Sequence, residues 1–303
     1  MSDPRPEQPT SKRFTASDGV EIEYYDLGTG PALLNPHPYG GSATNQLPLL
    51  AGLSDRFRCV TFSQRGWGET PLAGAISLDR SAQDAHELLE FLGIDDAYFV
   101  GLSMGASVMF AYVARYGTQF MNRAFIMDMT PSLVNRDDFV GGLYQGWYSP
   151  ERYAADLALQ ETDLPTFLRY FYEQALFPHT RDQVRTFVAD PQFDGPLEAA
   201  AALTGVTAAE MYAGAPNDPA TLRAYWRAMG EADFRADLAR FDVPTFLYYA
   251  QPGSIYDQRT AEFVRDQIPG SELAYSPDST HMSFLAQNLA EQVALIREFA
   301  DPA

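Results

Sequence analysis

The sequence predicts a doubly wound α/β fold built on a mostly parallel sheet. Five short apolar runs recur along its 303 residues, PALLN, RCVTF, AYFVGLS, RAFIMDM and PTFLYYA, and ELAYS is a sixth candidate. These runs are apolar throughout rather than alternating, which is typical of parallel strands buried on both faces. Helical patterns lie between them, and an alternation of strands and helices indicates a doubly wound sheet.

The remaining elements follow in chain order. Residues 20–30 (VEIEYYDLGTG) alternate in polarity and end in a glycine-containing turn, which predicts an antiparallel strand. Residues 81–94 place apolar side chains on one helical face, with Gly93 as the C-terminal cap. Residues 104–117 are apolar nearly all round, so we expect a deeply buried helix. A last helix is predicted over residues 283–300.

The alternation of strands and helices breaks between residues 132 and 235, where the sequence is helical in pattern and rich in aromatic residues. We interpret 132–235 as a helical cap inserted into one α/β core, which comprises residues 14–131 and 236–303. Residues 1–13 are polar and contain proline, so we expect a disordered tail there.

The chain is strongly acidic, with 21 Lys and Arg against 40 Asp and Glu and a formal net charge of −19. Such a charge repels nucleic-acid phosphates and anionic lipid head groups, so we expect neither nucleic acid nor a membrane as partner. The N-terminus has no apolar signal core, and no run approaches the roughly 20 apolar residues of a membrane span. We therefore expect a cytoplasmic protein, and the sequence leaves its oligomeric state open.

The chain contains one cysteine, Cys59, which excludes an internal disulfide framework and a cysteine zinc cluster. Cys59 lies in an apolar run, where a buried structural thiol is expected, because catalytic thiolates need an electropositive, partly exposed setting. The sequence also lacks the H-E-x-x-H motif, a Walker loop and a G-x-G-x-x-G at its first strand–helix turn. We therefore expect no metal and no cofactor.

The motif Gly101-Leu102-Ser103-Met104-Gly105 lies directly between an apolar strand and an apolar helix. A serine on such a sharp turn needs small residues two positions away on either side. The N-terminus of the following helix then directs free N–H groups toward the reaction site. The motif predicts that Ser103 is a nucleophile.

With three further motifs, this turn makes the chain resemble the α/β-hydrolase superfamily. HPYGGS at residues 37–42 is similar to the superfamily's oxyanion loop, and THMSFL at 280–285 to the loop of its catalytic histidine. SQRGWGETP at 63–71 is similar to an Asp-x-Arg-Gly-x-Gly-x-Ser segment, with Ser63 in the Asp place and Thr70 in the Ser place. The resemblance implies an eight-stranded sheet with a cap, and a triad in the chain order Ser, Asp or Glu, His.

The oxyanion loop departs from the superfamily pattern at Pro38, which stands where glycine is usual and has no N–H. The donors implied by the resemblance are therefore the backbone N–H groups of Tyr39 and of Met104, the residue after the nucleophile. We expect His37 to brace the loop. The candidates for substrate contact are His37, Trp147 and Met282.

Four histidines narrow the choice of general base. His281 lies in the loop after the last predicted strand, where the superfamily keeps its base, and is our candidate. His86 lies in a predicted helix, where a surface or half-buried residue is expected. His179 lies in the predicted cap, where an ordinary loop histidine is expected, and contact with substrate stays open.

The acid is the least regular part of the predicted triad. The superfamily's commonest acid position, in the turn after PTFLYYA, holds Gly253. Some members, including many haloalkane dehalogenases and zearalenone-type lactone hydrolases, carry the acid after the strand that follows the nucleophile helix, which is Asp128 here. We favour Asp128 as the residue that orients His281. Asp257, expected to cap a helix, stays open as an alternative, and Asp278 suits a turn better.

These assignments predict a serine hydrolase that cleaves an ester or lactone of a mostly apolar small molecule through an acyl-enzyme. A serine nucleophile argues against dehalogenation, which uses an aspartate there. The alternatives are a same-fold lyase, a C–C hydrolase, a perhydrolase or an aminopeptidase-type amide hydrolase. A non-catalytic ligand receptor is the least favoured, because Ser103 and His281 are both present.

Overall fold

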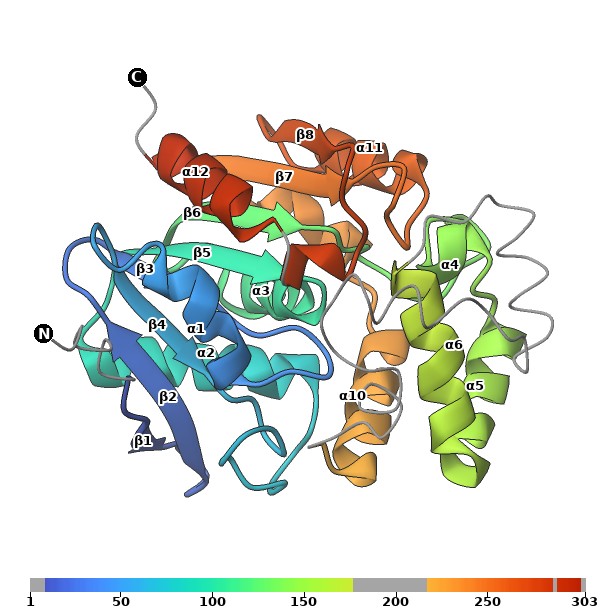
Figure 1. The fold of residues 1–303 in the computed structure, drawn as a ribbon, viewed down its shortest axis with the longest axis horizontal. Helices are drawn as coiled ribbons and strands as arrows, with labels where there is room; N and C mark the ends of the chain where they lie inside the picture. Colours follow the sequence, from blue (N-terminus) through green and yellow to red (C-terminus); the bar gives the residue numbers. More distant parts are fainter. Residues whose placement is uncertain (1–8, 177–216, 286–287, 301–303) are drawn as a thin grey trace, which may run out of the picture.

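The computed structural model of the chain describes residues 9–176, 217–285 and 288–300. Its centre is an eight-stranded sheet with the strand order β1-β2-β4-β3-β5-β6-β7-β8 (Figure 1). The strands β3 to β8 are parallel, whereas β1 and β2 pair in antiparallel fashion, which confirms the predicted mostly parallel α/β fold. The strands are β1 (Lys12–Thr15), β2 (Glu21–Leu27), β3 (Ala32–Leu34), β4 (Arg58–Phe62), β5 (Ala97–Leu102), β6 (Met121–Met127), β7 (Thr245–Ala250) and β8 (Glu272–Ser276).

The last two residues of the predicted tail, Lys12 and Arg13, instead begin β1. Lys12 pairs in register with Tyr24 of β2, and its ammonium forms an ion pair with Asp26 at 3.3 Å. The guanidinium of Arg13 lies 2.7 Å from the carboxylate of Glu69. These contacts hold a polar strand at the edge of the sheet, which composition alone did not indicate.

Helices cover both faces of the sheet. Successive residues of β5 alternate between two hydrophobic cores, as the pleat of a strand requires. One core includes α2 (Leu78–Leu92) and α3 (Met104–Tyr116), which pack against each other. The other includes residues of α1 (Ala43–Ala51) and α12 (Leu289–Ala300). The helix α11 (Gln258–Gln267) lies between β7 and β8 in the chain.

Local signals set the helix ends. α2 begins before the predicted residue 81, because the Ser77 hydroxyl accepts a hydrogen bond from the N–H of Arg80 at 3.0 Å. It ends at Gly93, as predicted, where φ is 67°. The predicted helix over residues 283–300 is divided into the short 3-10 helix η2 (Ser283–Leu285) and α12.

Between β6 and β7 the chain forms a helical segment beside the carboxyl ends of the parallel strands (Figure 1). Trp226 there packs edge-on against Phe167 and Phe171 at 4.8 and 5.1 Å between ring centroids. The predicted cap limits of 132–235 stay a prediction, and His179 lies outside the described residues. The helices are α4 (Leu143–Gly146), α5 (Pro150–Thr162), α6 (Leu164–Leu176), α10 (Pro219–Glu231) and the 3-10 helix η1 (Arg235–Arg240).

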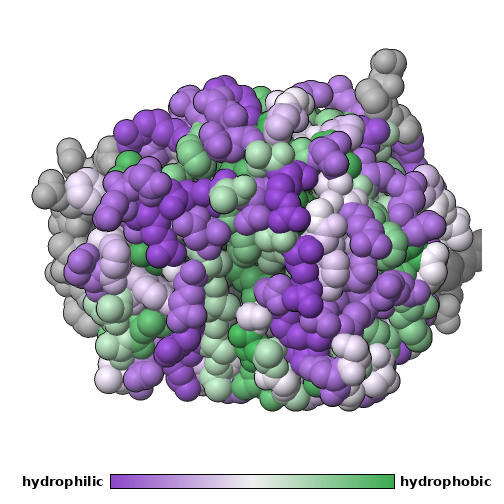
Figure 2. Space-filling view, turned by 180° about the vertical axis from the view of Figure 1, so that it is seen from behind, coloured by the Kyte–Doolittle hydropathy of each residue, from purple (hydrophilic) through white to green (hydrophobic). Residues whose placement is uncertain are grey.

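Polar residues cover most of the face shown in Figure 2, and apolar residues gather in a hollow near its middle. A largely polar face agrees with a chain in which 20% of the residues are charged. Among the described residues, no helix combines the length and the apolar character needed to cross a membrane.

Candidate active site

Ser103 lies on the turn between β5 and α3 with φ 53° and ψ −126°, a backbone conformation that L-residues rarely adopt. The two glycines of the motif make this turn possible. A Cβ on Gly105 would lie 2.2 Å from the carbonyl oxygen of Pro36, and one on Gly101 would lie 2.6 Å from the sulfur of Met109. The spacing of small residues in the motif is therefore a steric requirement.

The hydroxyl of Ser103 begins a chain of hydrogen bonds that includes both other predicted triad residues. Ser103 Oγ lies 3.1 Å from His281 Nε2, and His281 Nδ1 lies 2.7 Å from Asp128 Oδ2. Asp128 is fully buried and His281 is 5% exposed. With a proton on Nδ1 donated to Asp128, Nε2 is left to accept the proton of Ser103.

Asp128 follows the last residue of β6 and has a φ of 44°, in the left-handed region that costs energy for a residue with a side chain. Its N–H donates to the carbonyl of Tyr248 at 3.0 Å. Its second carboxylate oxygen, Oδ1, accepts from Ser254 Oγ at 2.7 Å and from the N–H of Ala250 at 3.4 Å. Both oxygens of this buried carboxylate therefore have donors.

The two other acid candidates lie elsewhere. Asp257 caps α11, where its Oδ1 accepts from the N–H of Arg259 at 2.9 Å, and it forms an ion pair with the same arginine. Asp278 is exposed in the turn after β8. Among the hydrogen bonds of the described residues, neither carboxylate reaches His281.

The usual acid position, Gly253, is closed to any side chain. A Cβ there would lie 2.0 Å from the carbonyl oxygen of Ser279. The close approach allows two backbone contacts. Gly253 forms a β-bridge with Thr280, and its carbonyl accepts from the N–H of His281 at 3.2 Å. The turn that the family resemblance offered as the usual acid position instead holds the backbone of the candidate base.

The two predicted oxyanion donors lie near Ser103. Met104 is the first residue of α3, so its N–H has no acceptor within the helix. The N–H of Tyr39 has no backbone acceptor among the described residues. Tyr39 and Ser103 both line the same small cavity. Their role in binding an oxyanion stays a prediction.

The ring of His37 is occupied by the loop that it belongs to. Its Nδ1 lies 2.8 Å from the carbonyl oxygen of Pro38, and its Nε2 accepts from the N–H of Gln64 at 3.0 Å. Burial lowers the pKa of His37 to about 4, so the ring is neutral at physiological pH. This geometry favours the bracing role over contact with substrate.

His86 is also committed elsewhere. It is buried in α2, its Nδ1 lies 2.9 Å from the hydroxyl of Tyr112, and its ring stacks on Tyr116 at 4.0 Å. His86 lies in a helix as expected, but the expectation of a surface or half-buried residue is wrong, because it is 8% exposed and packed against aromatic rings of α3.

Ser103 and His281 open onto a cavity of about 10 Å³, space for about one water molecule. Trp147 and Met282, predicted as substrate contacts, are not among its lining residues in the described part of the chain; the N–H of Met282 donates to Ala175 of α6 at 3.0 Å. The other lining residues are Tyr39, Met129, Leu133, Leu143, Phe171, Trp226, Met229 and Tyr256.

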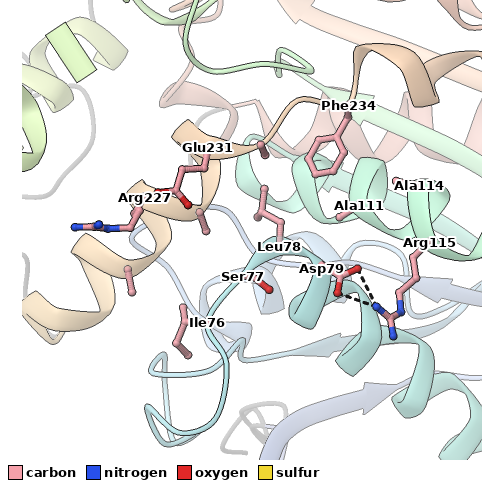
Figure 3. A pocket seen from close by; sticks show the side chains of 13 residues that line it. Ile76, Ser77, Leu78, Asp79, Ala111, Ala114, Arg115, Arg227, Glu231 and Phe234 are labelled. Atoms are coloured by element: carbon pink, nitrogen blue, oxygen red, sulfur yellow. Dashed lines mark hydrogen bonds and ion pairs between the residues drawn. The ribbon is translucent and has the colours of Figure 1, made fainter. Parts of the chain in front are cut away.

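A hollow of about 430 Å³ lies on the outer side of α10, between that helix, α2 and α3 (Figure 3). The ion pair of Asp79 and Arg115, 2.8 Å apart, forms part of its wall. Because it contains neither Ser103 nor a histidine, it is not the candidate active site. Trp226 and Met229 face the cavity at Ser103, whereas Arg227 lines this outer hollow.

Ser63 stands where the family motif has an aspartate. A carboxylate from another strand, that of Glu23 in β2, lies beside it. Ser63 Oγ donates to Glu23 Oε2 at 2.7 Å and accepts from the N–H of Ala43 at 3.1 Å. Thr70 Oγ1 accepts from the N–H of Glu23 at 2.9 Å. The serine in place of an aspartate was the signal that a carboxylate from elsewhere could be needed here. Only the pairing of the strands identifies that carboxylate as Glu23.

Sequence reasoning missed three residues around the acid: Ser254, Tyr256 and Gln145. The ring of Tyr256 packs edge-on against His281 at 5.8 Å between centroids. Gln145 has a φ of 57° and donates from its backbone to Ile255 at 2.9 Å. No local pattern distinguishes these residues from ordinary loop positions.

The fold and the site together define an α/β protein in which a serine, a histidine and a carboxylate are joined by hydrogen bonds at the carboxyl edge of the sheet. A family model described as alpha/beta hydrolase fold matches residues 31–286. The chain therefore belongs to the α/β-hydrolase family.

Individual relatives are distant. The non-heme chloroperoxidase of Kitasatospora aureofaciens is 26% identical over 276 residues, which cover 88% of this chain and 90% of the relative. The 3-oxoadipate enol-lactonase 1 of Acinetobacter baylyi is 21% identical over 257 residues, 85% of this chain and 84% of the relative. Among solved structures, an esterase from Exiguobacterium antarcticum is similar with a TM-score of 0.77 at 18% identity, covering 96% of this chain and all of that one.

Proposed function

We propose that the protein is a serine hydrolase that cleaves an ester or lactone of a mostly apolar small molecule. The observation that carries this proposal is the continuous hydrogen-bond chain from Ser103 through His281 to Asp128. A serine hydroxyl is a poor nucleophile until a base takes its proton, and the resulting imidazolium needs a buried anion beside it.

Each step of the proposed reaction can be assigned to a named residue. Ser103 Oγ forms a bond to the substrate carbonyl carbon as its proton passes to His281 Nε2. The N–H groups of Tyr39 and Met104 stabilise the oxyanion. His281 returns the proton to the departing alcohol oxygen as the C–O bond breaks, which leaves an acyl-enzyme. Water repeats the sequence on the acyl carbon and releases the acid, with Asp128 orienting His281 in both halves.

The character of the cavity supports an apolar substrate. Its described lining is mainly aromatic and aliphatic and includes no Asp, Glu, Lys or Arg. The hydroxyl of Tyr39 is engaged with the carbonyl of Leu222 at 3.0 Å. An aminopeptidase-type hydrolase needs a carboxylate for the substrate amine, so this lining favours an uncharged ester or lactone instead.

The test is covalent labelling with a fluorophosphonate probe, followed by turnover of p-nitrophenyl esters and of simple lactones. We expect one adduct, on Ser103, and a loss of turnover in Ser103→Ala on the order of 10⁶-fold. Labelling at a different residue, or full turnover by Ser103→Ala, would refute the proposal. Comparing the two substrate panels then separates ester from lactone cleavage.

A second candidate is perhydrolysis, in which hydrogen peroxide replaces water in attacking the acyl-enzyme. The similarity to a bifunctional esterase/perhydrolase of Acinetobacter calcoaceticus, 32% identical over 124 residues that cover 40% of this chain, favours it. Formation of peracetic acid from acetate and peroxide, measured for the wild type and for Ser103→Ala, decides whether the same serine supports this reaction.

A further inference from the structure

We propose that Ser254 is a positioning residue for Asp128, whose hydroxyl holds one carboxylate oxygen so that the other faces His281. The inference rests on the proposed function, because it assigns a role within the same triad. It concerns a residue that no part of the family motif marks.

The contact is short, buried and directional. Ser254 Oγ lies 2.7 Å from Asp128 Oδ1, while Asp128 Oδ2 lies 2.7 Å from His281 Nδ1. Ser254 is 2% exposed. Because Ser254 Oγ accepts from the N–H of Tyr256 at 2.9 Å, its single proton is directed to the carboxylate.

The second donor to Asp128 Oδ1 is weaker. The N–H of Ala250 lies 3.4 Å from this oxygen, beyond the usual range of 2.7–3.2 Å for a hydrogen bond from nitrogen. A buried carboxylate that loses a donor loses stabilisation that water cannot replace. Without Ser254, Asp128 Oδ1 keeps only the long contact to Ala250, so the carboxylate is less constrained about its terminal torsion and fixes the plane of His281 less firmly.

The turn after β7 thereby contacts both partners of the candidate acid–base pair. The carbonyl of Gly253 accepts from the N–H of His281 at 3.2 Å, and the next residue, Ser254, reaches Asp128. The turn itself is held by Gln145, whose side-chain amide donates to the carbonyls of Ser254 and Tyr256. This turn, which the resemblance offered as the usual acid position, here supports the acid through Ser254.

The experiment compares Ser254→Ala, Ser254→Cys and Ser254→Thr with the wild type. Ser254→Cys keeps the size of the side chain but is a weak donor, and Ser254→Thr keeps the hydroxyl. The matched control is Ser81→Ala, a buried serine of α2 that is 2% exposed. The readouts are the second-order rate of fluorophosphonate labelling, kcat and KM on p-nitrophenyl butyrate, their pH profiles, and the unfolding temperature.

We expect Ser254→Ala and Ser254→Cys to label and turn over roughly tenfold to a hundredfold more slowly, by analogy with the residues that orient metal ligands through hydrogen bonds. KM should stay within about twofold. The acidic limb of the pH profile should move to higher pH, because a carboxylate without its second donor binds the imidazolium more strongly. Ser254→Thr should recover most of the rate, and Ser81→Ala should match the wild type.

Wild-type rates and an unchanged pH profile in both Ser254→Ala and Ser254→Cys would overturn the proposal. A rate loss that tracks the unfolding temperature and leaves the pH profile unchanged would also overturn it, since that is the behaviour of a structural serine. Failure of the proposed function looks different: the wild type itself would not be labelled at Ser103.

Discussion

Asp128 Oδ2 lies 2.7 Å from His281 Nδ1, although 153 residues separate the two in sequence. Asp128 follows β6 and His281 follows β8, two parallel strands separated in the sheet by β7 alone. Because the carboxyl ends of parallel strands share one edge, a carboxylate after β6 reaches a histidine that follows β8. For the contact with His281, the position of the acid in the sequence matters less than its location at the carboxyl edge of the sheet.

Replacing Asp128 with Asn should separate it from Asp257. Asp128→Asn presents an amide to His281 Nδ1 and favours the wrong ring tautomer, so kcat should fall on the order of 10³–10⁴-fold. Asp257→Asn, the matched control, alters a helix cap and should leave kcat near the wild-type value. Steady-state kinetics on a p-nitrophenyl ester measures both. A large loss in the Asp257 variant with none in the Asp128 variant would reverse the assignment.

An acid returned to the turn after β7 should not rescue the enzyme. Gly253→Asp in the Asp128→Asn background should stay inactive, because even a Cβ would lie 2.0 Å from the carbonyl of Ser279. Gly253→Ala alone should lower both the unfolding temperature and kcat, since it forces apart the backbone that holds His281. Recovery of turnover in the double variant would show that the turn can relax around a side chain.

Gln145→Ala should loosen the turn after β7, although no hydrogen bond of the described residues joins Gln145 to Ser103 or His281. It removes two hydrogen bonds to the carbonyls of Ser254 and Tyr256, and their loss should cost roughly 1–3 kcal/mol in the free energy of unfolding. We expect kcat to fall more than KM rises, because the turn supports Asp128 rather than substrate. Urea unfolding and steady-state kinetics measure the two effects. Gln83→Ala, which removes an amide contact to Glu87 on α2, is the control.

His37 should make stability depend on pH. Burial lowers its pKa from 6.5 to about 4, so between these pH values the unfolded chain binds a proton that the native ring does not. Its contribution to the free energy of unfolding is therefore constant above pH 6.5 and decreases as the pH falls from 6.5 toward 4. Between about pH 7 and about pH 5 the decrease should be about 2 kcal/mol. His37→Gln, compared by urea unfolding at both pH values, should lack it; equal pH dependence in the two proteins would contradict the assignment.

Cys59 should be unreactive in the native protein. It is fully buried in β4, and burial raises the pKa of its thiol to about 12, so almost no thiolate is present at neutral pH. Titration with a disulfide reagent should detect no thiol in the folded protein and one in denaturant, since the chain has a single cysteine. Rapid reaction without denaturant would show that β4 opens.

The sequence predicted the strands β2 to β8 but not β1, and it named the three residues that hydrogen bonds join in the candidate triad. Apolar strands buried on both faces are readable from local composition, and the motif around Ser103 combines a steric requirement with its context. Asp128 was inferred from the superfamily resemblance: the commonest acid position holds Gly253, and the resemblance offers a second position after the strand that follows the nucleophile helix. Without that resemblance, the sequence of this chain alone would not have distinguished Asp128 from an ordinary aspartate at a strand end.

The supporting residues could not be found this way. Ser254 and Gln145 act through contacts with residues 126 and 109 positions away, and both look like ordinary polar loop residues. The carboxylate of Glu23 beside Ser63 is likewise brought there by antiparallel pairing of β2 with β4. Which of the many aromatic residues between β6 and β7 face Ser103 depends on helix packing that local periodicity does not determine.

The closed turn at Gly253 also bears on the evolutionary history of the site. A mutation that introduced a carboxylate there would displace the backbone that holds His281 before the new acid could contribute. We therefore expect a carboxylate after β6 and a glycine in the turn after β7 to depend on each other. Homologues with a carboxylate after β6 should keep glycine in the turn after β7, and the loss of either one should accompany the loss of the other.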